Sequence, residues 1–209
     1  MSFNILNVIW FKDRCLLPPK ADKKVLYQKI DEIRSLFSIK MDDYPIDIFQ
    51  LLHSIRDLIE VEIKEFSGKL GGFLIYNNLP NKSAMILNKN SNLSFSAAHE
   101  IIHFLAHGGY GYDYLLHSSK PSGSCIEWQA NEGAAELLLP YKLIVPEFVN
   151  LEIDTKGAIE YLAQKYKVSK TIIAYRLNSL TFEINQYIKE KDINKVTLIS
   201  QRQLKNYLG

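Results

Sequence analysis

Two histidines and a glutamate are spaced in this chain as a hydrolytic zinc site requires. Residues 99–103 read HEIIH, so His99 and His103 are four positions apart and Glu100 follows the first. On a helix, positions i and i+4 share a face, and both imidazoles can therefore reach one metal ion while the carboxylate stays off it. A catalytic zinc keeps one position for water, and Glu100 would accept the proton as that water attacks a carbonyl.

The residues around this motif predict the helix that the chemistry needs. Residues 94–107 read SFSAAHEIIHFLAH, with apolar positions at nearly helical spacing and neither proline nor glycine inside. Asn92 or Ser94 can cap the start of the helix, and the glycine pair at 108–109 ends it. A histidine on an apolar helical face is usually a core residue, but two that flank a glutamate favour a metal site.

A catalytic zinc needs a third protein ligand, and the sequence offers several. The sixth position after the second histidine is a glycine, which excludes the metzincin pattern. A second predicted helix at 125–140 reads CIEWQANEGAAELLLP and carries Glu127 on the same face as small residues that permit close packing. Asp113 and His117, in the loop between the two helices, are rival ligands.

Two further glutamates lie on the second predicted helix. At the helical rotation per residue, Glu132 and Glu136 fall about 140° and 180° around the helix from Glu127. They therefore point away from the metal, and we expect them to be solvated or to support the ligands indirectly.

The loop between the two motif helices, GGYGYDYLLHSSKPSGS at 108–124, is rich in glycine, tyrosine and serine. A loop of this length over a site is often a lid. Its polar side chains could stabilise an oxyanion opposite the metal, and the sequence does not choose among Tyr110, Tyr112, Tyr114 and His117.

The two motifs together resemble a known family. HEIIHFLAH and, 24 residues after His103, EWQANEGAAELLLP are similar in order and spacing to the motifs of the ImmA/IrrE-type metallopeptidases. The resemblance implies a zinc ion bound by His99, His103 and Glu127, with Glu100 as general base. It covers residues 44–140 well and the flanks poorly.

The same resemblance marks two supporting positions and two departures. His107 and Asn131 match family positions from which they could support the ligands. Ile102 replaces the family's glycine between the histidines, and Gly133 replaces its phenylalanine. Neither departure touches a ligand, but the element that faces Ile102 must accommodate its bulk.

The function that this resemblance implies is a cytoplasmic zinc endopeptidase. Its protein substrate would be a helix-turn-helix transcriptional repressor, often one encoded by a mobile element or phage. The alternatives are a catalytically silent zinc-binding regulator that binds its partner without cutting it, and a DNA-binding regulator that uses the C-terminal helices. The intact Glu100 argues against the silent regulator, because a retired site needs no general base.

Composition agrees with an ordinary globular chain. The 209 residues are 47% hydrophobic, and 25 basic against 23 acidic side chains give a net charge of +2, which favours neither nucleic acid nor a membrane surface as partner. Cys15 and Cys125 are too few for a disulfide framework, so reduced thiols in a cytoplasm are expected. We expect no signal peptide and no transmembrane helix.

The hydrophobic pattern predicts an α+β fold, with a small antiparallel sheet, zincin-like motif helices and a C-terminal helical extension. Helices are expected over 20–39 and from Pro45, and a meander of strands over 60–66, 70–76 and 83–88. The last strand is a candidate edge for binding a substrate backbone. The expected divisions are an N-terminal helical extension (1–43), a metallopeptidase core (44–150) and a helix-turn-helix-like region (151–209).

Residues 157–182 in that last region read as a helix, a turn near 166–168 and a second helix that Ser169 caps. Lys170 and Arg176 on the second helix could meet phosphates. The apolar spacing is equally that of two helices packed on a core, and basic residues are few, so we expect a structural role and no direct nucleic-acid binding.

Overall fold

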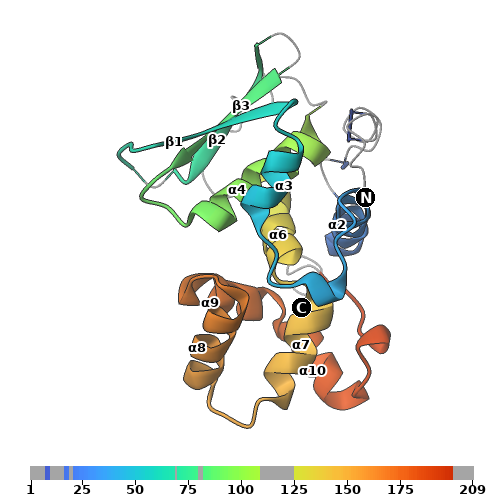
Figure 1. Cartoon of the computed structure of the whole chain (residues 1–209). Coiled ribbons are helices and arrows are strands. Elements are labelled where there is room, and N and C mark those ends of the chain that lie inside the picture. The colour runs from blue at the N-terminus through green and yellow to red at the C-terminus, as the bar shows by residue number, and fades with distance from the viewer. Residues whose placement is uncertain are drawn as a thin grey trace.

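The computed structural model describes residues 8–9, 17–18, 21–68, 70–79, 82–108 and 125–199. Helices precede and follow a small three-stranded sheet, and the last helices form a separate layer away from it (Figure 1). The expected α+β class and helical C-terminal extension are thereby confirmed. Within these ranges, no helix has both the length and the apolar run needed to cross a bilayer.

The sheet contains β1 (Ile59–Lys64), β2 (Gly72–Leu79) and β3 (Lys82–Asn88), in the order β1-β3-β2. The strand β3 runs antiparallel to β2 but parallel to β1. The three predicted strands are confirmed, whereas the prediction of a purely antiparallel meander is wrong, because the sheet is mixed.

The position of β3 follows from its side chains. This strand is apolar on both faces and almost wholly buried, so it takes the centre, whereas the alternating charges of β1 suit an edge. The buried side chain of Asn88 donates to the carbonyls of Phe66 (3.0 Å) and Leu70 (3.1 Å). These bonds hold the β1–β2 connection across the end of β3, so that β3 lies between the two earlier strands.

The first motif helix, α4 (Leu93–Ile102), packs against β2 and β3. Asn92 caps it, accepting a hydrogen bond from the backbone N–H of Phe95 (3.0 Å). The helix then continues as a wider π-helical turn over His103–His107. The predicted helix over 94–107 is thus present, with its last turn in a geometry that often occurs at functional sites.

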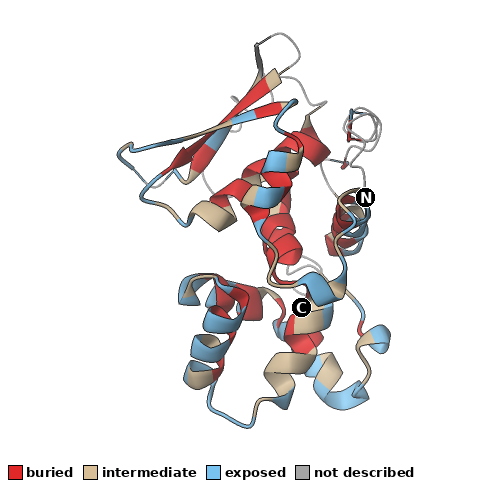
Figure 2. Ribbon diagram, viewed as in Figure 1, coloured by how far each residue is buried: buried red, intermediate tan, exposed pale blue. Residues whose placement is uncertain are grey.

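The second motif helix, α6 (Cys125–Leu138), lies along α4 and also contacts α2 (Lys23–Leu36). Fully buried alanines at 130 and 134 let the helices approach closely, and Figure 2 shows both motif helices buried over most of their length. Pro140 separates α6 from α7 (Tyr141–Asn150). This arrangement fixes the carboxylates of α6 relative to the histidines of α4.

The remaining helices lie before the sheet and after α7. Before the sheet lie a short 3-10 turn (Met41–Asp43) and α3 (Ile48–Ser54), which begins three residues after Pro45. After α7 come α8 (Thr155–Tyr166), α9 (Lys170–Ser179), α10 (Thr181–Glu190) and a 3-10 turn (Ile193–Lys195). The α8–α9 pair has the predicted turn, and the Ser169 side chain caps α9 by accepting from the N–H of Ile172.

A buried charge cluster joins α2, α6 and α9 and corrects the sequence expectation for Glu132 and Glu136. Arg176 is fully buried, and its guanidinium donates to Glu132 (2.9 Å) and Glu136 instead of facing a phosphate. Arg34 of α2 donates to Glu136 from the other side (3.0 Å). Glu132 and Glu136 are therefore not solvated: they lie in the interface with α2 and α9, where arginines neutralise them.

Candidate metal centre

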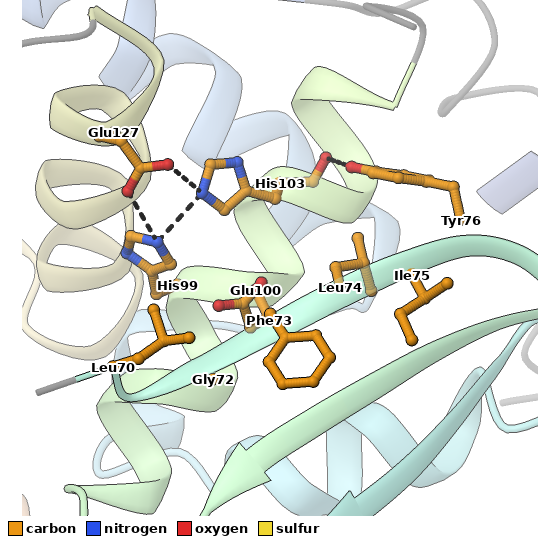
Figure 3. A pocket seen from close by; sticks show the side chains of 10 residues that line it. All are labelled: Leu70, Gly72, Phe73, Leu74, Ile75, Tyr76, His99, Glu100, His103 and Glu127. Carbon is orange, nitrogen blue, oxygen red and sulfur yellow. Dashed lines mark hydrogen bonds and ion pairs between the residues drawn. The ribbon is translucent and has the colours of Figure 1, made fainter. Parts of the chain in front are cut away.

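Three side chains from α4, its π-helical turn and α6 converge on one point beside the sheet (Figure 3). The Nε2 atoms of His99 and His103 are 3.0 Å apart. The Glu127 carboxylate faces both, at 3.5 Å from His99 Nε2 and 3.3 Å from His103 Nε2. Within the described residues, these are the only three histidine, cysteine or acidic side chains that form such a group.

These separations fit a zinc ion. Ligand atoms bonded to a tetrahedral zinc at about 2.0–2.1 Å lie roughly 3.3 Å from one another. The three distances in the cluster bracket that value, and the donor set of two imidazoles and one carboxylate is one that catalytic zinc uses. The residues present therefore suit the metal that the sequence motif implies.

Each imidazole is held at its other nitrogen, which turns its Nε2 toward the cluster. His99 Nδ1 lies 3.1 Å from Oδ1 of Asn131, an atom that can only accept a hydrogen bond. His103 Nδ1 lies 3.1 Å from His107 Nδ1, and the rings of these two histidines are 5.1 Å apart. Contacts of this kind orient metal ligands and select the tautomer that leaves a lone pair for the metal.

The charges of the cluster depend on one another. Hydrogen bonds from His103 and His99 hold the pKa of Glu127 well below its usual range, although partial burial opposes the effect. Burial alone would lower the pKa of His99, but its hydrogen bond to Glu127 and the charge of Glu100 raise the pKa overall. Glu127 is thus an ionised carboxylate aimed at the two rings, as a metal ligand must be.

Glu100 lies beside the cluster but is not one of the three converging groups (Figure 3). Its carboxyl group is buried, and burial raises its pKa, while the neighbouring histidines His99 and His103 oppose the rise. A carboxylate with a raised pKa in a cleft is suited to accepting and returning a proton.

A cleft of about 470 Å³ opens in front of these residues. The strand β2 forms one wall, and the histidines and glutamates form the other (Figure 3). Gly72 at the start of β2 allows this close approach: a Cβ there would lie 2.9 Å from the carbonyl oxygen of Ile86 and 3.5 Å from Cγ of Glu100. A side chain at this position would have to displace the backbone of β3 at Ile86, whereas its contact with Glu100 would be ordinary.

The strand beside the cleft is not the one expected from the sequence. The expectation placed a free edge on the strand at 83–88, but β3 is paired on both sides. The edge strand that lines the cleft is β2, with its apolar side chains Phe73, Leu74 and Ile75, and Leu70, just before the strand, also lines the opening. The prediction was wrong because apolar residues on both faces mark a central strand and not an edge.

Several residues at this site gave no signal in the sequence. Tyr76 lines the cleft, and its hydroxyl donates to the carbonyl oxygen of His103 (2.7 Å), which ties the middle of β2 to the π-helical turn. Gln129 is fully buried on α6, behind His107. Only the fold, which brings them next to His103 and His107, shows that they belong to this site.

The sequence candidates in the loop between the motif helices lie outside the described residues. They are the rival ligands Asp113 and His117 and the possible oxyanion stabilisers Tyr110, Tyr112, Tyr114 and His117. Their roles stay predictions.

Comparison with known proteins agrees with this geometry. Residues 59–178, more than half of the chain, match the peptidase M78 family in its IrrE N-terminal-like domain. No curated protein matches the chain significantly. A solved structure of a Mycobacterium tuberculosis transcriptional regulator is similar, with a TM-score of 0.51 and 16% identity over 86% of this chain and 53% of that one. This chain thus spans about half of that regulator, and the likeness concerns the fold alone.

Proposed function

Since the chain belongs to the peptidase M78 family, in which residues 59–178 form an IrrE N-terminal-like domain, we propose that it is a zinc endopeptidase. The observation that carries the proposal is the convergence of His99 Nε2, His103 Nε2 and the Glu127 carboxylate next to Glu100. We assign the first three residues as zinc ligands and Glu100 as the general base.

A zinc ion at this position supplies Lewis-acid activation of water and of a peptide carbonyl. Glu100 then takes a proton from the attacking water at a carboxylate oxygen and returns it to the nitrogen of the departing amine. Its burial favours this cycle, because a raised pKa makes the carboxylate a better proton acceptor. His107 and Asn131 act indirectly, by orienting His103 and His99 through their Nδ1 atoms.

The wall formed by β2 supports binding of an extended peptide. An edge strand offers unpaired backbone groups, and a substrate segment can add to it as a further strand. The apolar side chains of Leu70 and Phe73 are exposed at this wall and favour apolar residues near the cleaved bond. We propose that the substrate is a helix-turn-helix transcriptional repressor and that cleavage takes place in the cytoplasm.

The alternative of a DNA-binding regulator that uses the C-terminal helices has less support. Its strongest candidate for a phosphate contact, Arg176, is fully buried and paired with glutamates. Lys170 is exposed but forms an ion pair with Glu160.

The test compares the wild type with Glu100→Gln, each purified and loaded with zinc. Both proteins should bind zinc, because Glu100 is not a ligand. Only the wild type should cut a co-incubated helix-turn-helix repressor into a discrete fragment. Loss of zinc from the variant would make Glu100 structural. Zinc binding by the wild type without cleavage of any repressor in a panel from the same genome would favour the silent regulator.

A further inference from the structure

A chain of hydrogen bonds leads from His103 to a backbone carbonyl near the start of the protein. His103 Nδ1 lies 3.1 Å from His107 Nδ1, and His107 Nε2 lies 3.0 Å from Oε1 of Gln129. The amide nitrogen of Gln129 then donates to the carbonyl oxygen of Pro18 (2.8 Å). The three side chains are buried, so water does not compete readily for these bonds.

The Pro18 carbonyl oxygen, as the last acceptor, fixes which group donates in each of these hydrogen bonds. A proline carbonyl can only accept, so the NH2 group of Gln129 faces Pro18 and its oxygen faces His107. That oxygen requires a hydrogen on His107 Nε2. A neutral imidazole carries one N–H only, so His107 Nδ1 is bare and accepts from His103 Nδ1–H. These bonds need no hydrogen on His103 Nε2, so this atom, which faces Glu127 and His99, can offer its lone pair to a metal.

The opposite direction would disable the ligand. If His107 donated from Nδ1, His103 would have to accept at Nδ1 and carry its hydrogen on Nε2, where a metal must bind. A fully buried imidazole is also poorly able to carry a second proton, which would reverse the bond to His103. The direction set by Gln129 is therefore the one that a metal site needs.

The segment that carries the Pro18 carbonyl is itself bonded to the π-helical turn. The backbone N–H of Leu17 donates to the carbonyl of Ala106 in the π-helical turn (3.0 Å), and the Leu17 side chain is fully buried. The segment at 17–18 is thus attached to the same turn that carries His103 and His107. Three parts of the chain far apart in sequence meet in one hydrogen-bonded unit.

We propose that Gln129 is a positioning residue that, through His107, keeps a hydrogen on His103 Nδ1 and so leaves His103 Nε2 for the metal. The inference rests on the proposed zinc site. Gln129 would raise the affinity of the site for zinc and would not contact the substrate. Loss of an outer hydrogen bond to a metal-ligating histidine typically lowers affinity by about 10–100-fold.

The test reads the tautomers directly in metal-free protein labelled with ¹⁵N at histidine, by long-range proton–nitrogen NMR. In the wild type, His103 should carry its hydrogen on Nδ1 and His107 on Nε2. In Gln129→Met, which keeps the side-chain length without polar atoms, His107 should lose this preference, and zinc affinity should fall by about 10–100-fold. The matched control Gln164→Met, at an exposed glutamine on α8, should change neither quantity.

A second pair of variants keeps the test decisive if Gln129→Met does not fold. His107→Asn retains an acceptor for His103 Nδ1–H, whereas His107→Leu removes it. The asparagine variant should bind zinc more tightly than the leucine variant, and equal affinity of the two would overturn the proposal.

Two outcomes separate this proposal from the proposed function. Zinc binding by a wild type whose His103 carries no hydrogen on Nδ1 in the metal-free state would overturn the positioning role and leave the metal site intact. The expected tautomers in a protein that binds no zinc would overturn the metal site, and the positioning role with it.

Discussion

The side chain of Ile102 occupies the space that a larger residue would need at Gly133. A Cβ placed on Gly133 would lie 3.3 Å from both Cγ1 and Cγ2 of Ile102 and 3.3 Å from Cδ1 of Ile30. At these two positions the sequence lacks the glycine on the first motif helix and the phenylalanine on the second that the ImmA/IrrE pattern has. We expect the two departures to compensate each other, because the bulk lost from α6 is supplied by α4 across one contact.

This contact predicts strong coupling between the two positions. Gly133→Phe alone should destabilise the protein by roughly 1–3 kcal/mol or more, because it overpacks a closed interface. Ile102→Gly alone should also destabilise it, because it leaves a cavity and a glycine at the end of α4. The double variant should be more stable than the sum of the two effects predicts. Urea unfolding of all four proteins measures the coupling, and additive losses would contradict the proposed compensation.

Removal of the Glu127 carboxylate should weaken zinc binding even though both histidines remain. Glu127→Ala should reduce zinc occupancy sharply, because two imidazoles alone hold a catalytic zinc poorly. Metal analysis after dialysis against a weak chelator measures this loss, with Glu152→Ala at an exposed position as the control. Unchanged occupancy would transfer the third ligand position to Asp113 or His117.

Because Arg176 belongs to the buried charge cluster, we expect it to stabilise the fold and not to bind phosphate. Arg176→Met leaves Glu132 and Glu136 without their shared partner in the interior, and we expect a loss of about 3–5 kcal/mol in the free energy of unfolding. Lys170→Met on the same helix, which removes an exposed ion pair with Glu160, should cost much less. Similar losses for the two variants in thermal or urea unfolding would show that the cluster is not a main support of the α6–α9 contact.

Because the Tyr44 hydroxyl is hydrogen-bonded and its pKa is raised, we expect the protein to lose stability at alkaline pH. It accepts from Arg34 Nε (2.9 Å) and donates to the carbonyl of Leu137 (2.8 Å), and burial raises its pKa to about 12, with Arg34 opposing the rise. The folded pKa is above the ordinary value of 10, so this contribution is complete below pH 10 and is lost as the pH rises through 12.

The matched variant for this prediction is Tyr44→Phe, which has no proton to lose. The stability advantage of the wild type over Tyr44→Phe should therefore shrink by roughly 2–3 kcal/mol between pH 10 and 12. Urea unfolding of both proteins below pH 10 and within this window measures the change. A constant difference would mean that the hydroxyl does not titrate differently in the folded and unfolded chains.

Much of the local structure was predictable because it depends on neighbouring residues. Spacing alone places His99 and His103 on one helical face, and capping residues set the starts of α4 and α9. The three strands likewise follow from short apolar runs separated by turn residues. The family motif adds Glu127, which the fold brings to within 3.3–3.5 Å of the histidines.

Contacts between segments that are distant in the sequence could not be predicted from the pattern of residues. A period of apolar residues says which face of a strand or helix is buried but not which element covers it, so the parallel pairing of β1 with β3 and the outer position of β2 among the three described strands emerged only in the fold. Charged residues such as Glu132 and Arg176 normally indicate solvent, and only their mutual contact makes burial possible.

The sequence by itself therefore determined the HEIIH motif and its helices, because the spacing of candidate ligands is a local property of a helix. The tertiary structure alone decided which strand faces this motif, which charges are buried and which side chain contacts His107 behind His103. The link between Gln129 and Pro18 joins residues 111 positions apart, and such a contact forms only when the hydrophobic core brings two separate segments together.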